Sequence, residues 1–209
     1  MSLKIVDGLK KIQGDINSAI ASEINLRMGK NRNRVLNRVR AASRSWLESQ
    51  PEIDSLKKTG IPNSLGSLFG LTSDMPSRAV AAILDAVVSS IDLRVGRANK
   101  YLKTNIELVF QRADFVNLLS LPEGFVITEK GEDLHWLDWL LTKGDTIIIS
   151  GYTYKAETGR GRSGGGFMKE GGAFRVPPEY SGTLENNFVV RAFEGREKEI
   201  NAILSELLQ

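Results

Sequence analysis

The sequence predicts an α+β fold: N-terminal helices, a small, mostly antiparallel sheet with a long glycine-rich hairpin, and a long C-terminal helix packed on that sheet. Three observations predict this class. Apolar residues recur at helical spacing in the first part of the chain. They alternate at strand spacing between about residues 92 and 156, and helical spacing returns after Thr183. We expect a basic helical region over residues 1–50 and an α+β core domain over residues 51–209, with a hairpin arm at about 150–176.

Helical periodicity runs from about Leu3 to Ala42, and Pro51 predicts that the helix before it ends near Gln50. Its first half carries an apolar stripe at steps of three and four residues, which places the stripe on one side of the helix: Ile5, Leu9, Ile12, Ile16, Ile20 and Ile24. Its second half is basic and amphipathic, with Arg32, Arg34, Arg38 and Arg40 around apolar residues. Such a helix is either a solvated face or a surface for DNA phosphates or an acidic partner protein.

Further elements follow in order along the chain. Residues Met75–Ile91 are rich in alanine and predict a buried helix. Strands are expected in DLRVGRA, in NIELVFQRA, in GFVITEKG and, most clearly, in DTIIISGYTYKA. The segment EDLHWLDWLLTKGD predicts a helix that Gly144 closes. A long terminal helix is expected to start near Gly182 or Thr183 and to bury Phe188, Phe193 and Ile200.

The stretch GRGRSGGGFMKEGG, Gly159–Gly172, poses the main functional question of this sequence. A phosphate-binding loop of the Walker A type needs Lys and Ser or Thr after its last glycine, and here Phe167 and Met168 follow Gly166. A dinucleotide fingerprint needs a helix after its glycines, and no helical pattern opens there. We therefore expect no nucleotide site and no cofactor.

A conformational role remains for the glycine stretch. Phe167 and Met168 gain nothing from exposure on a free loop, so a neighbouring subunit or the domain itself is expected to cover them. Arg160 and Arg162 add charged contacts at the rim. We interpret the stretch as the tip of a long hairpin that orders on assembly. A plain flexible hairpin loop is the alternative.

Composition narrows the function classes. The chain has 209 residues, a net charge of +3, one histidine and no cysteine. The lack of cysteine excludes disulfides, thiolate metal sites and a cysteine nucleophile. The N-terminus lacks the apolar run of a signal peptide, and no stretch reaches the roughly 20 apolar residues of a membrane span, so we expect a soluble protein. His135 and Asp138 share a helical face, but a metal site needs at least one more ligand. We expect no metal site and no catalytic constellation.

Short motifs in the last third of the chain carry a family resemblance. They are RSGGGFM at Arg162–Met168, the Val-Pro pair at Val176, Gly182 with Thr183, and Asn187 with Phe188, followed by a charged helix. The preceding WLDWLLTKGDTIIISGY is the matching helix-to-strand unit. Over about residues 132–208 the chain resembles tail-completion or neck proteins of tailed bacteriophages, the minor-tail-protein-Z-like and virion-morphogenesis group.

The resemblance implies a virion structural protein, a subunit of the neck, head–tail connector or tail-completion ring. Its expected partners are other copies of itself, portal or connector proteins and tail tube or terminator proteins, with Arg32, Arg34, Arg38 and Arg40 available to channel DNA. It implies no enzymatic activity and a location in the virion after assembly in the host cytoplasm. The alternatives are a tail terminator subunit, a DNA-binding protein that uses the basic helix 30–44, and an enzyme with a metal near His135.

Overall fold

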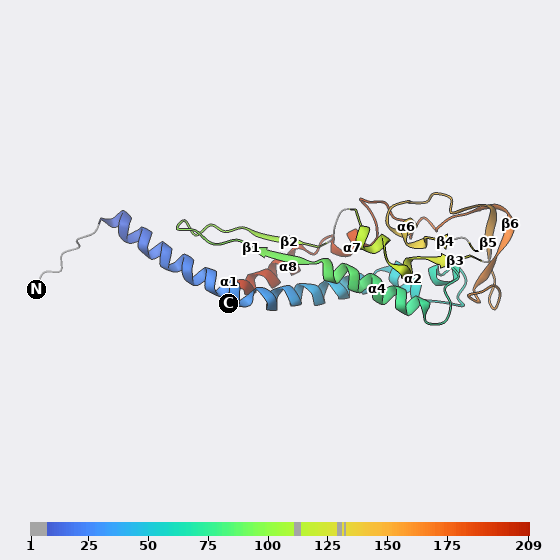
Figure 1. Cartoon of the computed structure of the whole chain (residues 1–209), viewed down its shortest axis with the longest axis horizontal. Helices are drawn as coiled ribbons and strands as arrows, with labels where there is room; N and C mark the ends of the chain where they lie inside the picture. The colour runs from blue at the N-terminus through green and yellow to red at the C-terminus, as the bar shows by residue number, and fades with distance from the viewer. Residues whose placement is uncertain (1–7, 111–113, 129–130, 132) are drawn as a thin grey trace, which may run out of the picture. The chain divides into compact units, whose positions relative to one another are not determined.

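The structure is a computed structural model and describes residues 8–110, 114–128, 131 and 133–209 (Figure 1). Its helices and strands follow one another in this order: α1 (Leu9–Glu48), α2 (Pro51–Lys57), α3 (Leu65–Leu68), α4 (Met75–Ser90), β1 (Asp92–Val95), β2 (Ile106–Val109), α5 (Val116–Leu119), η1 (Pro122–Gly124), β3 (Val126–Ile127), β4 (Asp133–Leu134), α6 (Trp136–Leu141), β5 (Ile149–Ala156), β6 (Gly166–Phe174), α7 (Phe188–Phe193), α8 (Glu197–Leu204) and η2 (Ser205–Leu208).

The predicted α+β class is confirmed, and so is the glycine-rich hairpin, which β5 and β6 form. The strands do not share one sheet, however. Within the described residues they form three separate two-stranded antiparallel sheets, β1–β2, β3–β4 and β5–β6. Each strand pairs with the next strand along the chain, because a hairpin closes over a short connection. The two-residue strands β3 and β4 expose too little backbone to recruit further strands.

The chain divides into two compact units. Unit 1 comprises residues 1–40, 91–109 and 196–209, and unit 2 comprises residues 41–90 and 110–195. Helix α1 runs without a break from the first unit into the second. It ends at Glu48, close to the end near Gln50 that Pro51 predicts, and Pro51 itself starts α2. Several predicted positions lie outside the described residues: Leu3 and Ile5 of the first helix, residues 111–113, Glu129, Lys130 and Glu132.

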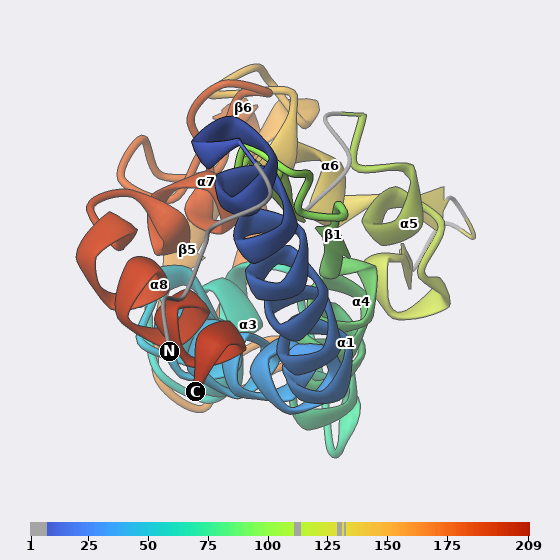
Figure 2. The same ribbon diagram turned by 90° about the vertical axis from the view of Figure 1, so that its left-hand side faces the viewer.

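The core of unit 1 lies between α1, β1 and the C-terminal segment. Met28, Val35 and Val39 are buried on α1 at steps of seven and four residues, the spacing of one helix face. Leu93 of β1 and Leu207 of η2 are buried as well. Figures 1 and 2 show α8 beside α1 within this unit. The apolar residues between the arginines of α1 therefore serve packing.

Unit 2 has the larger core, built around α4, α6 and α7. Trp136 is fully buried at the start of α6 and stacks on Phe69, with 5.2 Å between ring centroids. Helix α6 ends at Leu141, and its C-cap is Thr142, whose N–H donates to the carbonyl of Asp138. Gly144, which we expected to close the helix, lies two residues beyond this cap; it has a φ of +62°, and its N–H donates to the carbonyl of Gly182. Helix α4 matches the prediction for Met75–Ile91 and is apolar on its inner face.

The C-terminal segment differs from the single long helix that the pattern predicts. It forms α7, α8 and η2, with Glu194, Gly195 and Arg196 between the first two. Gly195 has a φ of +72°, in the left-handed region, and a residue in this conformation ends an α-helix. Helix α7 begins at Phe188, several residues after the predicted start near Gly182 or Thr183. Asn187 is its N-cap, and the side chain of Asn187 accepts hydrogen bonds from the N–H groups of Val189 and Val190. Helix α7 packs against α6 rather than on a sheet.

Candidate interaction surfaces

The basic half of α1 holds the first strand of unit 1. Arg40 donates to the carbonyl of Ile91 (2.8 Å), and Arg32 donates to the carbonyl of Leu93 (2.8 Å). Arg32 also reaches the carboxylate of Asp92 at 3.1 Å. Arg32 thus bonds to the backbone of β1, and Arg40 bonds to the residue directly before it. These two arginines thereby satisfy backbone acceptors at the strand's outer edge.

The neighbouring side of α1 holds the C-terminal segment. Arg38 forms an ion pair with Glu206, and Arg34 donates to the Glu206 carbonyl at 3.4 Å. Asn31 donates to the carbonyl of Leu207 at 3.3 Å. All four arginines of the predicted basic surface therefore contact other elements of unit 1. Arg38 still exposes 58% of its side chain, and the assignment of this surface to DNA or an acidic partner remains a prediction.

The glycine stretch folds on unit 2, whereas we expected a loop that orders on assembly. Its second half is strand β6, and its first half lies against α3 and the loop before it. Ser163 donates to the carbonyl of Ser67 at 3.0 Å. A Cβ on Gly165 would lie 2.3 Å from the hydroxyl of Ser67, and one on Gly161 would lie 1.8 Å from the carbonyl of Gly166. Glycine is thus required here for close approach of the backbone.

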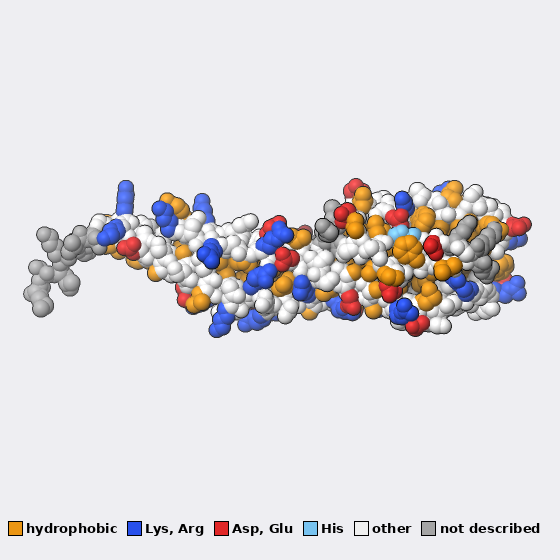
Figure 3. All heavy atoms as spheres, viewed as in Figure 1, with side chains coloured by type: hydrophobic (Ala, Val, Ile, Leu, Met, Phe, Trp, Pro, Cys, Tyr) orange, Lys and Arg blue, Asp and Glu red, His pale blue; other side chains and the backbone are white. Residues whose placement is uncertain are grey.

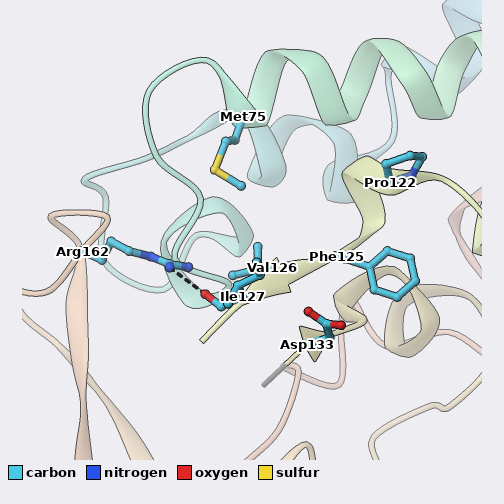
Figure 4. A pocket seen from close by; sticks show the side chains of 7 residues that line it. All are labelled: Met75, Pro122, Phe125, Val126, Ile127, Asp133 and Arg162. Atoms are coloured by element: carbon cyan, nitrogen blue, oxygen red, sulfur yellow. Dashed lines mark hydrogen bonds between the residues drawn. The ribbon is translucent and has the colours of Figure 1, made fainter. Parts of the chain in front are cut away.

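Arg162 fastens this loop and lines a cavity of about 550 Å³. Its Nε donates to the carbonyl of Gly70 (3.0 Å), and its Nη1 donates to that of Ile127 (2.9 Å; Figure 4). The rest of the lining is formed by Met75, Pro122, Phe125, Val126, Ile127 and Asp133. The cavity is mainly apolar and combines one guanidinium with one carboxylate.

Phe167 and Met168 lie on β6, where they are half-buried. Phe167 is opposite Lys155 and Met168 opposite Tyr154 in the register of the hairpin. The guanidinium of Arg160 lies over the ring of Phe167, 5.3 Å from its centroid. The domain therefore covers part of both side chains and leaves the rest accessible to a partner.

We expect Phe167→Ser with Met168→Ser to leave the monomer folded and to weaken assembly. The change removes apolar surface that the monomer only half covers, so its cost to folding should be about 1.5–3 kcal/mol, half the burial energy of two large side chains. Thermal unfolding and light scattering measure the two effects. Lys155→Ser with Lys169→Ser on the same hairpin is the control. A collapse of the melting temperature with normal assembly of the surviving protein would place both residues in the core.

His135 precedes α6, and its ring stacks on that of Phe125, with centroids 4.0 Å apart. Burial is the main reason why its pKa lies below the ordinary value, although the charge of Asp138 opposes the shift. Its Nε2 is buried without a hydrogen-bond partner. In the described part of the chain, no three His, Asp or Glu side chains are placed to hold a metal ion.

The first turns of α1 expose the apolar stripe that the sequence reveals. Leu9 is 80% exposed, Ile16 54% and Ile20 42%, and Ile12 is half-buried between them. Steps of three and four residues place the four on one face. The described residues of unit 1 leave most of this face exposed, and we call these four residues the α1 seam. The sequence contained its signal, but periodicity alone does not distinguish a stripe that packs inward from one that stays open.

No protein family, curated protein or solved structure matches this chain. Among the described helices, none has the length and apolar content needed to cross a bilayer.

Proposed function

We propose that the chain is a structural subunit of a tailed-bacteriophage virion, in the neck or tail-completion ring that joins head and tail. The α1 seam is the observation that carries the proposal. The seam has four aliphatic side chains on one helix face, and three of them are over 40% exposed. Their exposure to water is unfavourable, and their burial against a neighbouring subunit is favourable. The motifs over residues 132–208, which resemble those of tail-completion and neck proteins, indicate which assembly this is.

In this proposal the partner of the α1 seam is a second copy of the chain. Ring subunits contact each other through two different surfaces, so each seam packs on another face of the next subunit. Burying one Leu or Ile side chain contributes about 1.5–3 kcal/mol. Two such side chains therefore account for roughly 3–6 kcal/mol, and their loss should separate the subunits.

Leu9→Ser with Ile16→Ser tests this. We expect the unaltered protein to give oligomers by light scattering after size exclusion, with rings in negative-stain images, and the variant to give monomers. The expected loss of association is at least about 100-fold, from the side-chain energies above. Ser18→Ala with Ser22→Ala is the matched control on the opposite side of α1, where both hydroxyls bond only to carbonyls of their own helix.

The same measurement at low and high salt separates apolar from ionic association. Apolar contacts persist in salt, whereas contacts through arginines weaken. An unaltered protein that stays monomeric at both salt concentrations, and that joins no virion when supplied to assembling particles, would overturn the proposed function.

A further inference from the structure

The two units differ in the sign of their charge. Unit 1 carries 15 Lys and Arg against 8 Asp and Glu, a net +7, and unit 2 carries 13 against 17, a net −4. The net +3 of the whole chain conceals this separation. In the view of Figure 3, Lys and Arg side chains stand out along unit 1. A unit with this excess attracts polyanions.

Most arginines of α1 already have partners, and the unpaired cations gather elsewhere. The β1–β2 hairpin ends in residues 96–105, GRANKYLKTN, which contain no acidic residue. Arg97, Lys100 and Lys103 are exposed, and none has an ion pair within the described residues. Tyr101, 68% exposed, lies among them, with the Lys100 ammonium 5.2 Å from its ring centroid.

The hairpin tip has a defined conformation. The side chain of Asn99 accepts from the N–H of Tyr101 (2.8 Å) and of Lys103 (3.3 Å), and Leu102 takes a left-handed conformation that closes the turn. Asn25 of α1 clamps the tip through two hydrogen bonds to Ala98, one at 2.7 Å and one at 3.1 Å. The hairpin runs back along α1, as Figure 1 shows. The cations are thus presented with little ordering left to occur on binding.

We propose that this hairpin tip binds duplex DNA, with Arg97, Lys100 and Lys103 on backbone phosphates beside the major groove. A two-stranded ribbon fits the major groove, which is about 12 Å wide. Phosphates are the anions that unpaired lysines and arginines select, and the Tyr101 hydroxyl adds a hydrogen-bond donor. The single aromatic side chain favours a duplex, since platforms for single strands stack successive bases on several rings. The site belongs to unit 1 alone and does not depend on ring assembly.

Fluorescence anisotropy of a labelled duplex tests the proposal with the full chain, at KCl concentrations from about 50 to about 200 mM. Affinity should fall steeply with salt. Arg97→Ala, Lys100→Ala and Lys103→Ala together should flatten the slope of log K against log[salt] by roughly 3, because each lost phosphate contact removes about 0.9. The matched control removes three exposed cations from unit 2: Lys155→Ala, Lys169→Ala and Arg175→Ala. It should bind as the unaltered protein does.

Two further variants separate the contribution of charge from that of the hairpin's conformation. Lys100→Arg with Lys103→Arg retains the charges and should retain the affinity, which excludes a folding defect as the cause of any loss. Asn25→Ala releases the clamp, so affinity should fall several-fold while the salt slope, which counts phosphates, stays the same. Circular dichroism confirms that each variant is folded.

Three outcomes would overturn the proposal. The unaltered chain does not bind the duplex, the tip variant binds as well as the unaltered chain, or the unit 2 control loses as much affinity as the tip variant. Vesicles of mixed phosphatidylcholine and phosphatidylserine provide the competing polyanion. Tip-dependent binding to these vesicles without binding to the duplex would assign the hairpin to a lipid surface instead.

Discussion

Arg191→Ala is expected to lower the free energy of unfolding by about 3–5 kcal/mol at neutral pH, because it strands a buried carboxylate. Glu52, in the first turn of α2, has a side chain that is 0% exposed. It forms an ion pair with Arg191 of α7. Its second carboxylate oxygen, Oε2, is buried without a hydrogen-bond partner. A backbone hydrogen bond and Arg191 therefore compensate this charge together.

The effect of Arg191→Ala should depend on pH. Burial raises the pKa of Glu52 above its ordinary value, while its backbone N–H and Arg191 oppose the rise. A carboxyl with a raised pKa in the folded state contributes stability below its unfolded pKa, and this contribution disappears as the pH rises through the folded pKa. Without Arg191 the folded pKa rises further. The loss should thus be largest near pH 7.5 and shrink toward about pH 4.5, close to the ordinary pKa of Glu.

Urea unfolding at the two pH values measures this loss. Glu52→Gln combined with Arg191→Ala is the informative control, since it removes the charge together with its partner and should recover part of the stability. Arg191→Lys keeps the positive charge and should lose less than Arg191→Ala. An equal loss at both pH values would mean that Arg191 acts through its hydrogen bond to Asn186 (2.7 Å) and not through charge.

Periodicity predicted the elements whose pattern is long. The α1 and α4 helices and the β5 strand lie where spacing places them, because each repeats one periodic pattern over many residues. The predictions of a single sheet and of a single terminal helix were wrong. Strand pairing depends on contacts between distant segments, and the helix break depends on the left-handed conformation of Gly195, which the pattern of apolar residues does not register.

Predictions of binding residues were limited in the same way, because the partners of a side chain come from distant segments of the chain. The sequence alone does not show that Arg32 and Arg40 have partners, but Arg32 donates to the carbonyl of Leu93 in β1 and Arg40 to that of Ile91, the residue before β1. Conversely, Arg97 lies in a predicted strand, and Lys100 and Lys103 lie between two predicted strands, where the sequence predicted no site. Their signal was a run of residues, 96–105, with three cations and no acid. Only the hairpin and the Asn25 clamp bring these cations to one exposed tip.

Phe188→Ala is the second large effect, with an expected loss of about 3–5 kcal/mol in the free energy of unfolding. Phe188 begins α7 and is 0% exposed. Its removal leaves a cavity where α7 packs on α6. The loss of unfolding free energy grows by about 24 cal/mol for each Å³ of cavity that remains after the neighbouring side chains relax. Collapse is restricted here because Asn187 anchors this end of α7. Its amide donates to the carbonyls of Leu141 (3.2 Å) and Thr183 (2.8 Å).

Phe193→Ala at the other end of α7 is the matched comparison. The apolar stripe predicted that both phenylalanines are buried, but Phe193 is only half-buried, beside Phe110 at 4.5 Å and Trp46 at 6.2 Å between ring centroids. We expect its loss to be smaller, about 1–3 kcal/mol, since part of its surface is already in water. Denaturant unfolding of both variants gives the order. A larger loss for Phe193 would mean that the aromatic contacts with Trp46 and Phe110, and not the α6–α7 contact, hold the last helix of unit 2 in place.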